Sequence, residues 1–335
     1  PGPMRDAMMV GIDRGVNKRM RDAGALRGAG HDPVNGLSSL QGLVKLNHAG
    51  SWQEFREAIR LCTAFAQNIV YADVDGNIGY QASGLIPIRA KGQGLVPVPG
   101  WTGEYEWTGY IPFDETPSSF NPPNHFIVTA NNKTVDDDYP YLITHDWFPP
   151  YRARRIVQLL TAKERLSLDD FKEMQGDVRS LWAEELTRFL VGLKPRGKKQ
   201  KEALYYLRSW DFRVDKDSVA ATIFHTWYVK LASNLLRERL GEDLYEHYFS
   251  KRLGWNSFPM LAIPRLLEYP DSYWVGDGSD SNLKNRDNLV RLSLKQALEE
   301  LTDKLGPDLA TWNWGKVHTA SFRHPLGLAP PLDEV

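Results

Sequence analysis

The chain has 335 residues, of which 42% are hydrophobic and 25% are charged, an ordinary globular composition that allows a sizeable core. Its 41 basic and 42 acidic residues give a net charge of −1, which excludes a global electrostatic attraction to nucleic acid. No stretch has the apolar length of a bilayer-spanning helix, and the first residues lack the apolar core of a signal peptide. We therefore expect neither a nucleic-acid nor a membrane partner.

The first 37 residues differ in character from the rest. Residues 1–37 are rich in glycine, arginine and aspartate and show little periodicity, so we expect them to be poorly ordered. Because the chain starts with proline, we expect residues to precede it. Apolar residues then recur at helical spacing from Leu40 and again over 52–63. The only cysteine, Cys62, lies in the second helical pattern and is interpreted as a small packed hydrophobe.

A sheet region is predicted over residues 65–150. Two apolar runs flank Asp75-Gly76, and this pair predicts a hairpin with a type I′ turn. Prolines and glycines over 87–100 predict a long surface loop. The apolar run 126–128 predicts a short strand that ends at the asparagine pair 131–132.

From residue 151 to about 305 the pattern is mainly helical. Ser167 and Asp170 have the spacing of a capping box. Further helices are predicted at about 180–193, 198–210, 217–240 and 289–305. A returning strand is predicted over 311–325. Strands followed by a helical block and a last strand are typical of the α+β class.

Common catalytic and metal-binding motifs are missing from the sequence. The eight histidines do not form HxxxH or HExxH pairs, and the G-x-S-x-G motif of α/β-hydrolases does not occur. The segment 276–280 lacks the ligand pattern of an EF-hand and is interpreted as a polar turn. Lysines 198, 199 and 201 are interpreted as a solvated helix start. We therefore predict no cofactor.

Two residue types that suit an oxyanion site remain. Asn131 would follow the predicted strand, and Arg152 would begin the helical region. An amide donor beside a fixed cation can stabilise a developing negative charge. The asparagine pair is equally compatible with a simple turn, and Arg152 with an ordinary helix surface. The residues alone leave these alternatives open.

Several ordered motifs together carry a family resemblance. The stretch YADVDGNIGYQASGLIPIRAKGQGLVPVPGW, followed by TANN, YRARRIVQLL, SLDDFKEMQGDV and WGKVHTASFRHPLG, resembles the β chain of penicillin acylases, which are N-terminal-nucleophile hydrolases. The resemblance extends over residues 40–330 and leaves residues 1–37 unmatched. It implies a partial αββα sandwich with a large helical excursion, and it makes 38–335 the central part of such a β chain.

The resemblance implies roles for four residues. Asn131 would donate its side-chain amide to the oxyanion, and Arg152 would orient the site and help to hold charge. Gln67 and Asn68 would line the acyl pocket. The nucleophile would be an N-terminal serine whose own α-amine acts as base, a group that titrates near neutral pH. By the same resemblance, that serine and the family's α chain lie outside this sequence.

The resemblance also bears on substrate, metal and location. The substrate would be a small linear amide: a penicillin, a cephalosporin side chain or an acyl-homoserine lactone. The alternative is an inactive fragment or pseudoenzyme that only associates with another chain. Some relatives hold calcium where this chain has Asp136, Asp137, Asp138 and Asp146, but much of that site comes from other segments, so we expect no metal here. Relatives are mostly periplasmic or secreted, but no signal peptide is visible in these residues, so the location of this chain is undecided.

Overall fold

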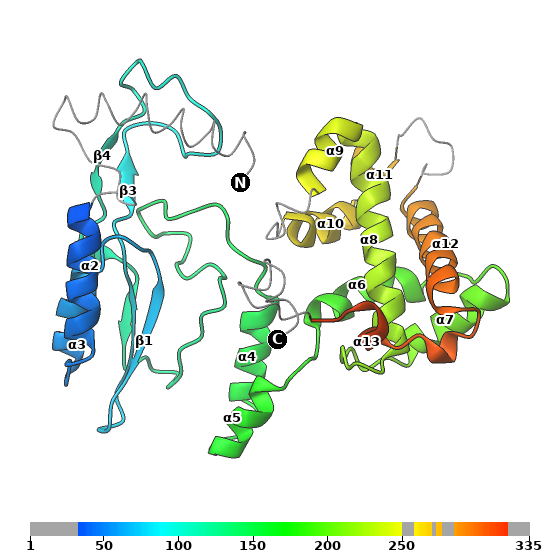
Figure 1. Ribbon diagram of the computed structural model, residues 1–335, viewed down its shortest axis with the longest axis horizontal. Coiled ribbons are helices and arrows are strands. Elements are labelled where there is room, and N and C mark those ends of the chain that lie inside the picture. The colour runs from blue at the N-terminus through cyan, green and yellow to red at the C-terminus, as the bar shows by residue number, and fades with distance from the viewer. Residues whose placement is uncertain (1–32, 250–257, 270–272, 277–284, 321–335) are drawn as a thin grey trace, which may run out of the picture. The chain divides into compact units, whose positions relative to one another are not determined.

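The computed structural model describes residues 33–249, 258–269, 273–276 and 285–320 (Figure 1). The chain divides into two compact units, residues 1–148 and 149–335, and each is described by itself. Of the segment 1–37 that we expect to be poorly ordered, residues 1–32 lie outside the described residues, as does most of the polar turn at 276–280. The expectation is wrong for residues 33–37, which form the start of a helix. In the described part, no helix combines the length and apolar character needed to cross a membrane.

Over its described residues, the first unit combines two α-helices with two small antiparallel sheets. Strand β2 is central in the larger sheet, whose order is β1-β2-β5, and β3 pairs with β4 in the smaller one. The elements are α2 (Pro33–Leu46), α3 (Trp52–Arg60), β1 (Asn68–Ala72), β2 (Ile78–Ala82), β3 (Pro87–Arg89), β4 (Trp107–Tyr110), the 3-10 helix η1 (Phe113–Glu115) and β5 (Ser118–Phe120).

An aromatic contact packs α3 against the larger sheet. The side chain of Ser51 caps the helix by accepting a hydrogen bond from the Glu54 backbone at 3.2 Å. The Trp52 ring stacks on Phe120 of β5 with the ring centroids 5.1 Å apart. The same ring lies so close to Gly79 that a Cβ there would approach it to 2.4 Å. Only glycine therefore allows Trp52 to lie against β2.

A buried polar network ties α3 to β2 and η1. Gln81 is completely buried, and its Oε1 accepts a hydrogen bond from Arg56 at 2.9 Å. Its Nε2 donates to Thr116 at 2.8 Å. Arg56 and Arg60 both pair with Asp114 at 3.0 Å. The buried amide therefore has partners on both sides, which avoids the cost of an unsatisfied polar group.

The predicted hairpin between β1 and β2 is confirmed, but its predicted turn type is wrong. Five residues, 73–77, connect the strands, and only Gly76 has a positive φ, of 86°. A type I′ turn would need a positive φ at Asp75 as well. The carboxylate of Asp73 instead accepts hydrogen bonds from Asp75 and from the backbone and side chain of Asn77. These bonds stabilise the longer connection.

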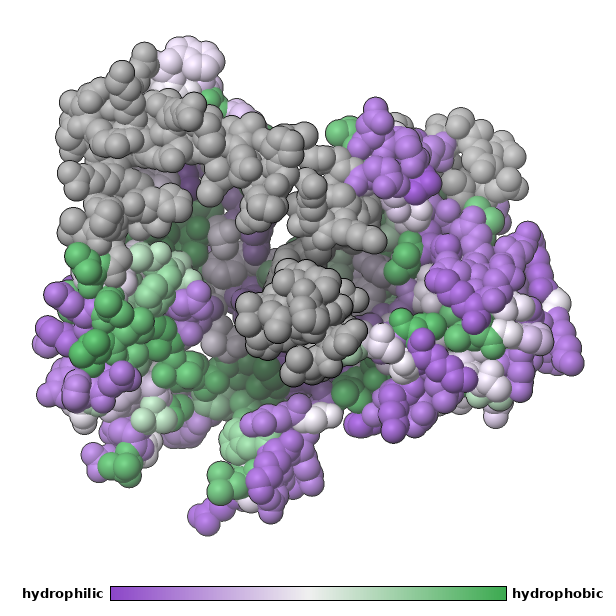
Figure 2. All heavy atoms as spheres, viewed as in Figure 1, coloured by the Kyte–Doolittle hydropathy of each residue, from purple (hydrophilic) through white to green (hydrophobic). Residues whose placement is uncertain are grey.

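The other predictions for the first unit have mixed outcomes. The long loop is confirmed over 90–106, although Pro87 belongs to β3. The strand predicted at 126–128 is wrong, because these residues pair with no strand in the described part of the chain. Helix α2 is confirmed, yet Leu40 and Leu43 are 60% and 41% exposed. Figure 2 shows hydrophobic residues gathered in the region of α2 and α3.

The second unit is helical throughout its described residues. The four helices predicted from apolar spacing are confirmed, as is the capping box of Ser167 and Asp170. The helices are α4 (Tyr151–Leu160), α5 (Leu168–Gln175), α6 (Leu181–Val191), α7 (Lys198–Arg208), α8 (Val219–Leu240), α9 (Glu242–Phe249), α10 (Phe258–Glu268), α11 (Tyr273–Gly276) and α12 (Arg286–Leu305), followed by η4 (Leu309–Thr311) and α13 (Trp314–Val317).

Helix α8 lies at the core of this unit (Figure 1). Ten of its residues are buried, as expected for a helix with apolar residues on most of its faces. The indole of Trp227 is fully buried and donates to the carbonyl of Val290 on α12 at 3.2 Å. Asn234 extends this contact by donating to Ser293 and Gln296. Apolar burial and hydrogen bonds therefore join α8 to α12.

The strand predicted at 311–325 is wrong over its described part. Residues 309–311 and 314–317 form helical turns instead. Trp312 is fully buried and donates to the carbonyl of Gly306 at 3.0 Å, while the Gly315 backbone donates to Lys216 at 2.7 Å. These contacts fold the segment onto the helical core, so its backbone pairs with no strand there. Residues 321–325 lie outside the described part.

A histidine in this core is held in an apolar setting. His225 of α8 lies against Trp182 of α6 and stacks on Trp314 with the ring centroids 4.6 Å apart. Its Nε2 is buried without a hydrogen bond among the described residues. Burial lowers the pKa of His225 from 6.5 to about 4, and the nearby His318 adds to this effect. The folded state therefore favours the neutral ring.

This environment predicts a pH dependence of stability. Because the folded pKa is lowered, the contribution of His225 is complete above pH 6.5 and is lost as the pH falls from 6.5 to about 4. The loss is on the order of 3 kcal/mol. It is measured by urea denaturation from pH 3.5 to 8 in wild type and in His225→Phe. The variant should lack this part of the acid loss, and identical pH profiles would contradict the prediction.

The contact at Gly79 predicts a large effect of a single methyl group. Gly79→Ala would force Cβ into the Trp52 ring and should lower the free energy of unfolding by about 1–3 kcal/mol. Gly109→Ala is a matched control in β4, because nothing lies within 4 Å of the added Cβ there. Urea denaturation checks both variants, and equal stability of the two would show that the contact is unimportant.

Candidate functional site

Asn131 lies in an irregular segment of the first unit, and its side chain is exposed. Its φ is 63°, in the left-handed region that asparagine tolerates better than most residues. Its carbonyl accepts a hydrogen bond from the Phe148 backbone at 2.8 Å. Asn132 folds the turn, because its Oδ1 accepts from Ala130 at 3.1 Å and its Nδ2 donates to the Lys133 carbonyl at 2.8 Å. The turn interpretation therefore describes the backbone of the pair.

Gln67 and Asn68 lie at the start of β1, and both are exposed. The Gln67 backbone exchanges two hydrogen bonds with Ser83, which is buried. The side chain of Asn68 accepts a hydrogen bond from the Tyr80 hydroxyl at 2.5 Å. Both predicted pocket residues are thus held by partners in β2 or just after it.

Tyr80 connects Asn68 to the segment that follows Asn131. Burial raises the pKa of the Tyr80 hydroxyl, and its hydrogen bond with Thr134 partly offsets this. Thr134 lies three residues after Asn131. The structure therefore brings Asn68 near the end of the asparagine turn, through a tyrosine that sequence reasoning missed. The available signal was the strand register, which makes residues 68 and 80 diagonal neighbours on one face of the β1–β2 ladder, two rungs apart.

Two tyrosines anchor the next part of this segment to η1. The Tyr139 hydroxyl donates to the carbonyl of Glu115 at 2.8 Å, and the Tyr141 hydroxyl donates to the Glu115 carboxylate. The two rings also meet edge to face. With the Phe148 bond, these contacts fix the segment downstream of Asn131 within the first unit.

Arg152 lies on the exposed face of α4, in the second unit. The motif YRARRI also contains Arg154 and Arg155, which have different partners in the structure. Arg155 forms a two-pronged ion pair with Asp177 at 2.8 and 2.9 Å, and its guanidinium lowers the pKa of that carboxyl. Arg154 lies 3.6 Å from Glu185. Arg155 therefore anchors the helix that carries Arg152.

The predicted calcium carboxylates do not gather into a ligand set. Asp136, Asp137, Asp138 and Asp146 are all exposed. Asp137 pairs with Lys133, which lowers the pKa of its carboxyl. Within the described ranges, no group of three or more histidine, cysteine, aspartate or glutamate side chains could hold a metal ion.

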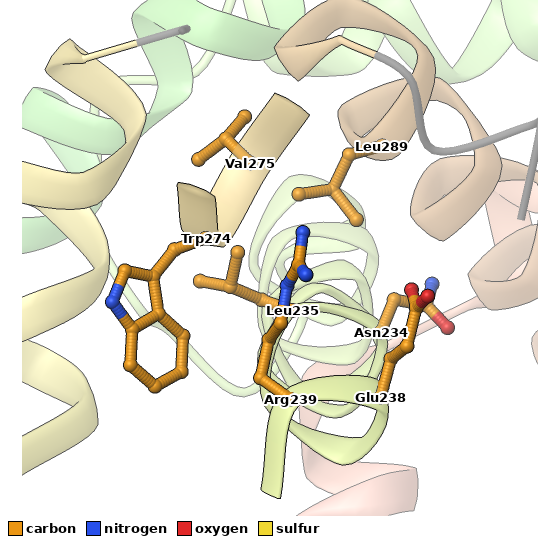
Figure 3. A pocket seen from close by; sticks show the side chains of 7 residues that line it. All are labelled: Asn234, Leu235, Glu238, Arg239, Trp274, Val275 and Leu289. Carbon is orange, nitrogen blue, oxygen red and sulfur yellow. The ribbon is translucent and has the colours of Figure 1, made fainter. Parts of the chain in front are cut away.

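Two cavities among the described residues differ greatly in size. One lies among α8, α11 and α12 and is lined by residues such as Asn234, Trp274 and Leu289 (Figure 3). Its volume of about 10 Å³ has room for roughly one water molecule, so it is no substrate pocket. The other, of about 270 Å³, lies in the first unit beside β3. The predicted site residues line neither cavity.

The chain belongs to the penicillin amidase family, because its sequence matches that family over residues 2–334. The match confirms the family resemblance of the motifs. It also begins at residue 2, so the expectation that residues 1–37 lie outside the family is wrong for nearly all of that segment.

Named relatives and a solved structure are consistent with this assignment. The chain is 32% identical over 293 residues to penicillin acylase 2 proenzyme of Pseudomonas sp. (strain SE83), covering 86% of this chain and 36% of that protein. It is 28% identical over 306 residues to the acyl-homoserine lactone acylase QuiP of Pseudomonas aeruginosa, covering 85% and 35%. The chain thus spans about a third of the length of these curated relatives.

The comparison of structures concerns the fold alone. A thermostable penicillin G acylase from Alcaligenes faecalis superposes with a TM-score of 0.66 at 23% identity, over 84% of this chain and 54% of that chain. The mixed helix and sheet architecture is therefore that of a penicillin G acylase. The finer αββα sandwich stays a prediction.

Because the backbone of Asn131 is left-handed, two substitutions should differ in their effect on stability. Asn131→Ala should lower the free energy of unfolding by about 1 kcal/mol, because alanine is strained at a positive φ. Asn131→Gly should leave stability nearly unchanged, because glycine adopts this conformation freely. Both variants lack the side-chain amide, so comparing their urea denaturation isolates the backbone effect. A glycine variant less stable than the alanine variant would contradict this account.

Proposed function

We propose that this chain is part of a penicillin acylase-type hydrolase that cleaves a small linear amide through an acyl-enzyme. The observation that carries the proposal is the family match over residues 2–334. The relatives named above act, by their names, on penicillin and on acyl-homoserine lactones. The substrate class is accordingly the side-chain amide of a β-lactam or of an acyl-homoserine lactone.

In this proposal Asn131 donates its side-chain amide to the oxyanion. The carbonyl of Asn131 is tied to Phe148, and the neighbouring turn is closed by Asn132, so the backbone that presents the amide is fixed before the reaction. A hydrogen-bond donor that needs no reorganisation gives the greatest stabilisation of the transition state. These bonds support the assignment without depending on where the other reacting groups lie.

Arg152 and the pocket residues take supporting roles. Arg152 orients the site and adds positive charge, supported by the Arg155–Asp177 pair that anchors its helix. Gln67 and Asn68 contact the acyl group, supported by the bond from Tyr80 that holds Asn68. Both roles depend on positioning, because a side chain that is already held in place loses less conformational entropy when the substrate binds.

The covalent steps need a serine from another part of the polypeptide. Its hydroxyl oxygen attacks the amide carbonyl carbon, and its α-amine accepts the hydroxyl proton. The C–N bond then breaks, and the proton passes to the leaving amine. Water hydrolyses the ester that remains. An α chain of the same precursor is the proposed partner, and one relative is itself named a proenzyme.

The second candidate is a non-catalytic chain that only associates with another polypeptide. The observation that favours it is the apolar face of α2, where Leu37, Leu40, Leu43 and Val44 are all exposed. An exposed apolar patch of this kind commonly marks a protein contact. The acylation assay separates this candidate from the first.

The activity test uses phenylacetyl- and hexanoyl-4-nitroanilide with the complete polypeptide that the proposal requires. Asn131→Gly should lower kcat by roughly 10²–10³-fold, the usual effect of losing one oxyanion donor. Folding should be unchanged, which circular dichroism checks. Full kcat in this variant would overturn the role of Asn131, and no nitroaniline burst from the complete wild type would favour the non-catalytic candidate.

A further inference from the structure

Of the two cavities introduced above, the one beside β3 is large enough for a ligand group. Its volume is about 270 Å³, close to the lower limit of small-molecule pockets. Its walls are mainly apolar and include Ile88, Ile111 and Leu142. Ile111 is almost fully buried, and its backbone donates to the Ile86 carbonyl at 2.9 Å. The wall therefore rests on fixed elements of the first unit.

Arg89 is the single charged residue that lines this cavity. It is half-buried, its backbone belongs to the β3–β4 ladder, and its guanidinium forms no hydrogen bond or ion pair with the described residues. The other arginines near the larger sheet differ, since Arg56 and Arg60 both pair with Asp114. A partly desolvated guanidinium without a counter-charge is unfavourable, and it binds an anion that satisfies its fork of N–H donors.

The local backbone explains why Arg89 lines the cavity together with Ile88. In a regular strand, neighbouring side chains point to opposite faces. The register of β3 with β4 shifts between Ile88 and Arg89, because β4 carries the extra residue Thr108 opposite them. A bulge of this kind increases the local twist of the strand pair, so the regular alternation is interrupted there. Gly94, at a φ of 73°, lies beside the guanidinium, and a Cβ there would approach Nε to 3.4 Å. The absent side chain leaves room for the arginine.

Two carboxylates of the first unit, those of Glu104 and Glu115, are engaged by other groups. Glu104 pairs with Lys91 at 3.0 Å. Glu115 accepts the hydroxyl of Tyr141, a residue that also lines the cavity. This bond raises the pKa of Tyr141, so the tyrosine stays neutral and leaves the guanidinium as the charge of the cavity. No aspartate or glutamate is among the lining residues.

We propose that this cavity binds a carboxylate joined to an apolar group. The carboxylate pairs with the Arg89 guanidinium, and the apolar group fills the space between Ile88, Ile111 and Leu142. Two sources share this chemistry: a free small carboxylic acid, and an aspartate or glutamate side chain of a polypeptide segment. The site goes beyond the proposed hydrolysis, because Gln67, Asn68 and Asn131 do not line the cavity.

The first arm of the test uses 3-phenylpropionate and its neutral amide as probes on the full 335-residue chain. Titration calorimetry and ligand-observed NMR measure the dissociation constants. The acid should bind at least roughly tenfold more tightly than the amide, because the charge-assisted pair is lost in the amide. Equal binding of the two probes, or binding of neither this acid nor the acidic peptide described below, would overturn the proposal.

Variants of the arginine assign the effect to this cavity. Arg89→Gln should weaken binding of the acid by at least roughly tenfold, and Arg89→Lys by less, because lysine keeps the charge without the planar fork. Lys45→Gln is the control, since it removes one exposed positive charge on α2 and should not change binding. Circular dichroism checks folding, and unchanged binding in folded Arg89→Gln would contradict the site.

The second arm distinguishes the two sources. An acetylated and amidated Ala-Leu-Asp-Leu-Ala peptide is compared with the same peptide carrying asparagine. Tighter binding of the aspartate peptide than of 3-phenylpropionate, with loss in Arg89→Gln, identifies a polypeptide segment as the occupant. Tighter binding of the free acid identifies a small molecule. Because no nitroanilide turnover is measured, either result is independent of the proposed hydrolysis.

Discussion

The flat contact between the Trp52 ring and β2 is the constraint on which the first unit depends. Gly79 leaves no room for a side chain beneath that ring, so α3 can lie directly on the sheet. The same strand then carries Tyr80 and Gln81, whose side chains hold Asn68 and Thr134 in one case and Arg56 and Thr116 in the other. A single strand thus links the helix, the predicted pocket residues and the segment after Asn131.

The second unit is built on a different principle. Apolar burial along α8 forms its core, and polar contacts hold the outer helices in place. The Arg155–Asp177 pair is the clearest of these, because both side chains are largely buried and the geometry is two-pronged. Arg152 is carried by the same helix but faces solvent. Arg155 therefore anchors the helix, while the role proposed for Arg152 needs only its exposed position.

The described residues of the first unit leave an apolar helix face exposed and a cation without a counter-charge. The leucines of α2 are exposed, and Arg89 is half-buried without a counter-charge in the described part. The chain also spans about a third of its curated relatives. An apolar face and a fixed cation are surfaces of the kind that further polypeptide or small ligands recognise. The proposed hydrolysis likewise depends on groups from outside these residues.

The sequence by itself determined the features that short-range physics controls. The capping box of Ser167 and Asp170, the hairpin after β1 and the main helices of the second unit depend on residues a few positions apart. The ordered family motifs likewise identified the penicillin amidase family, which the match over residues 2–334 confirms. The roles of Asn131 and Arg152 stay predictions.

Only the tertiary structure decided which segments find a partner. The apolar run 126–128 has the composition of a strand but no neighbour to pair with in the described part, and residues 309–317 fold into helical turns because Trp312 is buried in the helical core. The different partners of Arg154 and Arg155, and the half-buried position of Arg89, depend on residues far away in the chain. Strand pairing, burial and counter-charges are long-range properties, which local spacing cannot encode.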